Sequence, residues 1–228
     1  MTFNSKDILF EDNHLIIVNK RSGALVQGDK TGDKTLGDHI KEFLKKKYNK
    51  PGDAYLGVIH RLDRPTSGVV IFAKTSKALT RLNEQFKERM VDKKYWAITE
   101  KNNEAKFGKL ENWILKNSKQ NKSYIHLKKV SGSKIAKLKY QLIKELKNYL
   151  LLEVVLETGR HHQIRAQLSE IGFIIKGDLK YGSKRSNKDG SIDLHSYQVV
   201  FKHPVTKNII NIKAPLPKRE PWKSFLYD

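Results

Sequence analysis

Apolar residues recur along the chain with two different periods, and each period predicts a kind of secondary structure. Residues 14–20 (HLIIVNK) and 68–74 (GVVIFAK) are short runs rich in β-branched residues, which is typical of buried strands. Residues 138–146 (LKYQLIKEL) and 149–157 (YLLLEVVLE) alternate in hydrophobicity over most of their length and are joined by a short polar connection. That pattern predicts an antiparallel hairpin with one buried face.

Three other segments carry apolar residues at helical spacing. The first follows Thr35, a suitable N-cap, and we expect Pro51 and Gly52 to close it. The second begins near Ser76, and the third lies in the stretch 159–172, where Gly172 is a stop signal. The apolar stripes of the three helices are Leu36, Ile40, Phe43, Leu44 and Tyr48; Ala78, Leu82, Phe86 and Met90; and Ile164, Leu168 and Ile171.

The order of these elements indicates a fold class. Further strand-like runs lie at 95–99, in short apolar pieces of the lysine-rich stretch 100–136, and in the tail on both sides of a His-Pro turn. Many strands, few helices and no alternating βαβ repeat predict an α+β fold, with a mixed, largely antiparallel central β-sheet flanked by helices and loops. A length of 228 residues and no visible linker favour a single domain over 1–228.

Charge narrows the class of partner. The chain has 45 Lys and Arg against 24 Asp and Glu, a net charge of +21. Lysines and arginines that neutralise phosphates release condensed counterions, so such an excess favours nucleic acid over the alternative of lysines that serve solubility alone. A membrane surface is a weaker candidate, because no run is long enough to span a bilayer and the first residues lack the pattern of a signal peptide.

Several kinds of chemistry are disfavoured by residues that the chain lacks. It has no cysteine, which removes disulfides, thiol nucleophiles and zinc sites with cysteine ligands, and which fits the cytoplasm. None of the 8 histidines stands in an H-E-x-x-H spacing. The loop GDKTGDKT at 28–35 is not a phosphate-binding loop, because Asp33 stands where a glycine must precede Lys-Thr.

Residues 60–68 (HRLDRPTSG) place one carboxylate, Asp63, between two arginines. One interpretation is structural: an aspartate near proline and glycine usually accepts backbone hydrogen bonds in a turn. The other is functional: Arg61 and Arg64 keep Asp63 ionised and contact phosphates, so that the carboxylate acts as a nucleophile or base beside a polyanion.

A second basic element, GRHHQIR at 159–165, lies where a strand gives way to a helix. Helix N-termini bind anions, so Arg160, His162 and the first-turn amides could contact phosphate or orient the carboxylate; a solvated helix start is the plainer alternative. Tyr95, which follows two lysines, is either half-buried in a strand or offers its ring to a nucleobase.

Together these motifs resemble those of the RluA-type RNA pseudouridine synthases, over nearly the whole chain. The resemblance is carried by ILFEDNHLIIVNKRSG, HRLDRPTSGVVIFAK, KKYWAI, TGRHHQIRAQLSEIGFIIKGDLKYG and LHSYQVVFKHPVT, in that order. Motifs of this length in this order are specific. They imply the pseudouridine synthase catalytic fold, RNA as the partner, and no metal, nucleotide or redox cofactor.

The resemblance also implies roles for individual residues. Asp63 would be the catalytic aspartate, Tyr95 would stack on the target uracil, and Arg165 would pair with Asp63. Arg61 would lie beside the flipped nucleotide. The sequence assigns His60, Arg61, Arg160 and His162 to substrate binding. Whether Asp63 attacks the sugar or removes a ribose proton stays open, but both roles need an unstacked base in a closed pocket.

Three positions depart from the family pattern: Arg21 where proline is usual, Gln167 where histidine is usual, and Ile174 where proline is common. None is a proposed catalytic position, so they weaken the subfamily assignment more than the activity. The first motif begins at residue 8, so we also expect the accessory RNA-binding domain that many relatives carry in front of the catalytic domain to be absent.

Other functions remain as alternatives. The main one is a non-catalytic RNA-binding or ribosome-assembly protein on the same fold. A sugar hydrolase ordinarily needs two opposed carboxylates and a magnesium nuclease several, whereas one acid falls in the motifs. The sequence does not distinguish ribosomal from transfer RNA stem-loops as the substrate. A monomer without an obligate protein partner is the default expectation.

Overall fold

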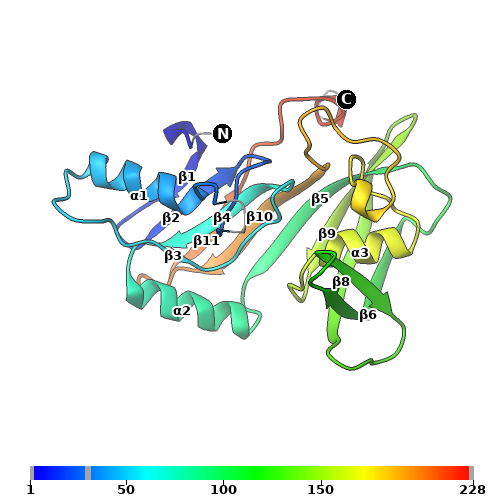
Figure 1. Cartoon of the computed structure of the whole chain (residues 1–228), viewed down its shortest axis with the longest axis horizontal. Helices are drawn as coiled ribbons and strands as arrows, with labels where there is room; N and C mark the ends of the chain where they lie inside the picture. The colour runs from blue at the N-terminus through cyan, green and yellow to red at the C-terminus, as the bar shows by residue number, and fades with distance from the viewer. Residues whose placement is uncertain (1–2, 29–31, 226–228) are drawn as a thin grey trace. The chain divides into compact units, whose positions relative to one another are not determined.

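The computed structural model describes residues 3–28 and 32–225 and divides into two compact units, each built from two stretches of the chain (Figure 1). Unit 1 comprises Met1–Val91 and Ser196–Pro215, and unit 2 comprises Asp92–His195 and Leu216–Asp228. The sequence therefore leaves unit 1, builds most of unit 2, and returns. That the two units work as one catalytic domain, as the sequence predicts, stays a prediction.

Unit 1 is a sheet with two helices. Strands β1, β2 and β4 pair antiparallel in that order, β3 pairs with β4, and β10, which neighbours β4, pairs with β11. The 3₁₀ turn η1 precedes the first strand. The bounds are η1 Ser5–Asp7, β1 Ile8–Glu11, β2 Leu15–Lys20, α1 Leu36–Lys47, β3 Gly57–Val58, β4 Ser67–Ala73, α2 Ser76–Lys87, β10 Leu194–Lys202 and β11 Ile209–Lys213.

The helices of unit 1 begin where the sequence predicts. Thr35 caps α1 in a capping box: its hydroxyl accepts from the Asp38 amide, and the Asp38 carboxylate accepts from the Thr35 amide. The helix ends at Lys47, ahead of Pro51. Met90 was placed wrongly on the stripe of α2, because that helix ends at Lys87 and the Met90 side chain is exposed.

The core of unit 1 lies between the sheet and α2. It joins strands that are far apart in the sequence, since buried residues of β2, β4 and β10 meet Ala78 and Leu82 of α2. Burial of such apolar side chains is the main force that holds the unit together. The members from the strands are Leu15, Ile17, Val69, Ile71, Ala73, Val199 and Phe201.

Unit 2 is an antiparallel sheet in the order β5-β9-β8-β6-β7 with one helix. The predicted hairpin is confirmed as β8–β9, and the lysine-rich middle forms β6 and β7. The bounds are β5 Asp92–Glu100, β6 Phe107–Asn117, β7 Lys122–His126, β8 Lys134–Glu145, β9 Tyr149–Leu156, α3 Gln163–Glu170, η2 Leu179–Tyr181 and η3 Lys223–Phe225.

Packing in unit 2 fixes α3 against the sheet (Figure 1). Ala166 of α3 packs with Ile114 of β6 and Ala136 of β8. The chain leaves the helix through Gly172, whose φ of +82° is the left-handed conformation that glycine adopts without strain, so the predicted stop is confirmed. The site segments that follow α3 are thereby held close to it.

The predicted α+β class, with a largely antiparallel sheet and flanking helices, is confirmed. Within the part of the chain that the structure describes, no helix is long and apolar enough to cross a membrane.

Candidate active site

Asp63 lies in a tight turn between β3 and β4 of unit 1. The turn is closed by the Thr66 amide, which donates to the Asp63 carbonyl at 3.0 Å. A second bond anchors it to the loop after β2, where the Gly23 amide donates to the Arg64 carbonyl at 2.8 Å. Both bonds use backbone groups, so they fix the path of the chain through Asp63 without using its carboxylate as the acceptor.

The backbone conformation and packing at position 68 explain why a glycine follows the turn. Its φ is +115°, and a Cβ built on it would lie 2.3 Å from the backbone oxygen of Ser196 on β10. Only a residue without a side chain fits this approach in an unstrained conformation. The motif therefore needs glycine here for close packing of two strands.

Lys20, the last residue of β2, is a member of this region that the sequence did not single out. Its side chain is 1% exposed. The ammonium donates to the carbonyls of Arg21 at 3.1 Å, Arg64 at 3.1 Å and Thr66 at 2.7 Å. Burial lowers the pKa of Lys20 from 10.5 to about 7, and the Asp63 carboxylate opposes that shift. The only sequence signal is a lysine that ends an apolar strand.

The structure gives His60 and Arg61 different environments. The Nε2 of His60 accepts from the Ile71 amide at 3.0 Å, and its ring stacks on Phe86 with the centroids 5.1 Å apart. Arg61 is exposed and donates to the Gln27 side chain at 3.2 Å. His60 is thus engaged in packing, while Arg61 is accessible to a ligand; the binding roles of both stay predictions.

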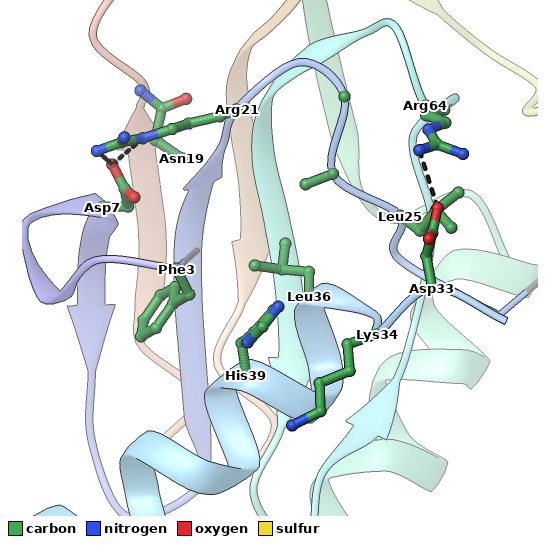
Figure 2. Close-up of a pocket in the computed structure, with 12 residues that line it drawn as sticks. Phe3, Asp7, Asn19, Arg21, Leu25, Asp33, Lys34, Leu36, His39 and Arg64 are labelled. Carbon is green, nitrogen blue, oxygen red and sulfur yellow. Dashed lines mark hydrogen bonds and ion pairs between the residues drawn. The ribbon is translucent and has the colours of Figure 1, made fainter. Parts of the chain in front are cut away.

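A polar pocket of about 270 Å³ lies in the same unit. Figure 2 shows an ion pair on each side of it: Arg64 with Asp33 at 3.0 Å, and Arg21 with Asp7 at 3.1 Å. Arg64 is the neighbour of Asp63 in the turn, so the pocket adjoins the candidate site. Exposed pairs of this kind are weak and can exchange a carboxylate for a phosphate.

Tyr95 lies in β5 of unit 2, opposite Val154 of β9. Its side chain is 7% exposed. The plain expectation of a strand residue is confirmed, and its ring is held in place by the sheet. Stacking on a base stays a prediction.

Arg165, on α3, is buried and held by a carboxylate that the sequence did not single out. Its Nε and Nη2 donate to the two oxygens of Asp178 at 2.6 and 2.8 Å. The two side chains are 5% and 1% exposed, and the guanidinium lies 5.0 Å from the centre of the Tyr181 ring. This two-point pair fixes the plane of the guanidinium with two of its five N–H groups. The pairing of Arg165 with Asp63 would join the two units and stays a prediction.

Arg160 and His162, which precede α3, are also tied to unit 2. The Nε of Arg160 donates to the Ile135 carbonyl at 3.0 Å. His162 is buried with a φ of +53°, and its Nδ1 lies 3.1 Å from the Tyr181 hydroxyl. Burial, with the positive charge of Arg165, lowers the pKa of His162 to about 2. His162 is therefore neutral at pH 7, and any phosphate contact it makes is that of an uncharged ring.

The described residues hold no group of three or more His, Asp or Glu side chains arranged to bind a metal ion. What the two units do present is a half-buried carboxylate on a braced turn in unit 1, and a rigidly held guanidinium beside a buried tyrosine in unit 2.

Solved structures identify the class of protein that has this fold. Human RNA pseudouridylate synthase domain containing 4 is 25% identical to this chain with a TM-score of 0.79, over 94% of this chain and 90% of that one. Human RNA pseudouridylate synthase domain containing 1, at 22% identity and a TM-score of 0.70, shares the fold.

The sequence places the chain within that class. The family model described as RNA pseudouridylate synthase matches residues 14–170, which include Asp63, Tyr95 and Arg165. The chain belongs to the RNA pseudouridine synthase family, whose members are isomerases that act on RNA. The family resemblance that the motifs carry is confirmed.

Relatives with curated names support the same family assignment. Ribosomal large subunit pseudouridine synthase C of Buchnera aphidicola (subsp. Acyrthosiphon pisum) is 36% identical over 92% of this chain and 67% of its own length. Ribosomal large subunit pseudouridine synthase D of Zymomonas mobilis is 31% identical over 93% of this chain and 69% of its own length. The chain thus spans about two thirds of the length of these relatives.

Proposed function

We propose that this protein converts specific uridines of structured RNA to pseudouridine, with Asp63 as the catalytic carboxylate. Tyr95 supports the uracil ring, and Arg165 pairs with Asp63 when the site is assembled. The observation that carries the proposal is the turn at 63–66: it lies within the family match, and its backbone is tied to the neighbouring loop and to a buried ammonium. A carboxylate whose main chain is fixed in this way is suited to act on one atom of a bound substrate.

The proposed reaction is an isomerisation, and its atoms balance without a co-reactant. The bond between the uracil nitrogen and the ribose breaks, the base turns, and a ring carbon forms the new bond to the ribose. The proton that this ring carbon loses is matched by one that the freed nitrogen gains. Asp63 acts either as the nucleophile toward the sugar or as the base that removes a ribose proton.

The substrate class follows from charge and from relatives. A net charge of +21 favours RNA, and exposed Arg61 is available to a phosphate or a displaced strand. Two relatives carry names that refer to the large ribosomal subunit, so large-subunit ribosomal RNA is the first candidate and transfer RNA the second. We place the reaction in the cytoplasm, and we expect a monomer.

The test is a map of pseudouridines in total RNA by carbodiimide labelling and reverse transcription. Four strains are compared: one with the wild-type protein, one without it, one with Asp63→Ala and one with Asp53→Ala. Asp53 is the matched control, an aspartate of the same unit whose side chain is fully exposed. We expect one or a few sites to disappear without the protein and with Asp63→Ala, and to persist with Asp53→Ala.

The alternative function, non-catalytic RNA binding or ribosome assembly, predicts a different map. All pseudouridines would then persist in every strain, while loss of the protein would change ribosome profiles. Filter binding with the purified proteins separates the two roles further, because Asp63→Ala should abolish modification and leave RNA affinity within about twofold. Sites that vanish without the protein but persist with Asp63→Ala would assign catalysis to another residue.

A further inference from the structure

The β6–β7 hairpin and the loop that follows it carry positive charge that no acid of the same segment offsets. Residues 112–134 contain six lysines and no aspartate or glutamate. The lysines are Lys116, Lys119, Lys122, Lys128, Lys129 and Lys134. Among the described residues, none of the six forms an ion pair with a carboxylate, whereas Lys137 of the next strand pairs with Glu111 at 2.9 Å. A polyanion would therefore meet ammonium groups here that have no carboxylate partner to exchange.

One face of this hairpin is open to solvent. Ile114 of β6 and Ile125 of β7 pack in the cluster that joins the sheet to α3. Because side chains alternate along a strand, Trp113 and Tyr124 lie on the other face. In both strands, which the structure describes in full, no residue of that face is fully buried, and Tyr124 is 39% exposed. This open face is turned away from α3, which carries Arg165.

Trp113 and Tyr124 are neighbours on the open face, and each has an ammonium group near its ring. Trp113 is opposite His126 in the register of the two strands, so it is the diagonal neighbour of Tyr124, about 7–8 Å away. The Nζ of Lys122 lies 5.5 Å from the centre of the Tyr124 ring. The Nζ of Lys129 lies 5.7 Å from the centre of the Trp113 ring. This combination suits a nucleotide, because its base stacks on an aromatic face while its phosphate binds a cation.

The turn of the hairpin is held in place by η2. The Lys180 ammonium donates to the carbonyls of Gln120 and Asn121, at 3.1 Å each. The Tyr124 hydroxyl in turn donates to the Gln120 side chain at 2.5 Å, which sets the orientation of the aromatic ring. A surface that is ordered before binding loses little conformational entropy when a ligand arrives.

We propose that the open face of the β6–β7 hairpin, with Trp113, Tyr124, Lys122 and Lys129, binds an unpaired segment of the substrate RNA outside the catalytic site. Two bases stack on the two rings, and the two ammonium groups neutralise their phosphates. Sheet faces with exposed aromatic side chains stack two or three bases of single-stranded RNA in other folds. A duplex hides its base faces, and an acidic peptide would use the lysines alone. The inference rests on the proposed function only in that the ligand is RNA.

The probe is a single strand of about 12 adenosines and cytidines, which has no uridine and therefore reports binding apart from catalysis. Fluorescence anisotropy of the labelled strand measures its affinity for the wild-type protein. The same strand in a duplex with its DNA complement, and polyglutamate as a competitor, test the two other kinds of partner. We expect the wild type to bind the single strand about 10-fold more tightly than either.

Substitution of the two rings locates the site. Trp113→Ala and Tyr124→Ala should each weaken binding of the single strand by at least about fivefold, because a base loses its stacking partner. Trp113→Phe keeps a ring and should stay within about threefold of the wild type. Phe107→Ala is the matched control: Phe107 is on the same face of β6 and is 78% exposed, but it is about 20 Å along the strand from Trp113. Its affinity should stay within about twofold.

Substitution of the two lysines tests the contacts to phosphate. The double variant Lys122→Gln and Lys129→Gln should lower the slope of log affinity against log salt by about 1.4, because each phosphate contact on a single strand contributes about 0.7. An unchanged slope would assign the phosphate contacts to other lysines and would contradict this part of the inference.

The inference as a whole is overturned if Trp113→Ala and Tyr124→Ala both fold and bind the single strand as the wild type does. Equal affinity for single strand and duplex, or tighter binding of polyglutamate, would also overturn it. If the alanine variants do not fold, the fluorescence that Trp113→Phe lacks provides the test in the wild type: the single strand should quench it, and no quenching would count against stacking. Asp63→Ala should bind the probe normally, and pseudouridine formation that survives Asp63→Ala would refute the proposed function instead.

Discussion

Among the residues that the structure describes, each unit buries one lysine or arginine, and the two side chains are satisfied in different ways. Lys20 of unit 1 gives its donors to three backbone carbonyls, none of which carries a full charge. Arg165 of unit 2 is paired with the carboxylate of Asp178 through two bonds. The lysine can lose its proton, whereas an arginine stays charged at any pH that the protein tolerates.

This difference shows what each cation can do for the site. An arginine locked by a carboxylate is a permanent charge in a fixed plane, which suits a partner for another anion. A lysine held by carbonyls bonds only main-chain groups, and burial brings its pKa to about 7. The two buried side chains should therefore respond differently to substitution of their partners and to pH.

Removal of the Asp178 charge should have the largest effect. Asp178→Asn removes the carboxylate that holds the buried Arg165 guanidinium through two bonds, which is expected to lower the free energy of unfolding by about 3–5 kcal/mol. Urea unfolding measures it. The control is Glu111→Gln, since the Glu111–Lys137 pair at 2.9 Å is in the same unit but exposed, and its loss should be below about 1 kcal/mol. Similar losses in both variants would contradict a special role for the buried pair.

Gly68→Ala tests how much the close backbone packing beside Lys20 contributes to the stability of unit 1. Lys20 and Gly68 are register partners on β2 and β4, and a Cβ at Gly68 would meet the Ser196 backbone. Strain at positive φ together with this clash should lower the free energy of unfolding by about 3 kcal/mol. Gly52→Ala is the control, because a Cβ at Gly52 has no atom within 4 Å. A neutral Gly68→Ala would show that the two strands can separate without penalty.

The sequence predicted most of the fold because the elements that pack on the core carry a clear period. β2, β4, α1, α2, the β8–β9 hairpin and the two C-terminal strands were all expected within a few residues. The extent of β6 was missed, because the exposed Phe107 and the partly buried polar Asn112 break the alternation of apolar and polar residues along the strand. Met90 was misplaced because the helical spacing continued in sequence after the helix had ended at Lys87.

The candidate site was predicted only where a local motif carries it. Asp63, Tyr95 and Arg165 stand in recognisable motifs, whereas Lys20 and Asp178 show their importance only through partners. Lys20 meets a carbonyl 46 residues away, and Asp178 meets a guanidinium 13 residues earlier. No periodicity encodes such contacts, because they depend on how loops return to the ends of strands and helices.

The pH dependence of stability should separate the two cations. The pKa of Lys20 is 10.5 when unperturbed and about 7 when buried, so above pH 7 the unfolded chain binds a proton that the folded chain releases. The free energy of unfolding of the wild type, relative to Lys20→Met, should therefore rise by about 2 kcal/mol between pH 7 and pH 9. Urea unfolding at each pH measures the difference, and Arg165→Met should show no such slope against the wild type. A difference that stays flat from pH 7 to pH 9 would contradict a lowered pKa for Lys20.

The smallest expected effect belongs to Arg64, the exposed counterpart of the two buried cations. Its pair with Asp33 leaves both side chains about half exposed, so the pair is worth less than about 1 kcal/mol. Asp33→Asn should therefore leave unfolding nearly unchanged and release Arg64 for phosphate, tightening RNA binding by about two- to fivefold at low salt, with a steeper dependence on salt. Asp53→Asn makes the same change in net charge at a fully exposed side chain whose nearest lysine is 3.8 Å away. Equal tightening of RNA binding in both variants would mean that net charge alone is responsible. A stronger effect of Asp33→Asn would show that Arg64, which Asp33 pairs with in the wild type, is part of the RNA-binding surface beside the Asp63 turn.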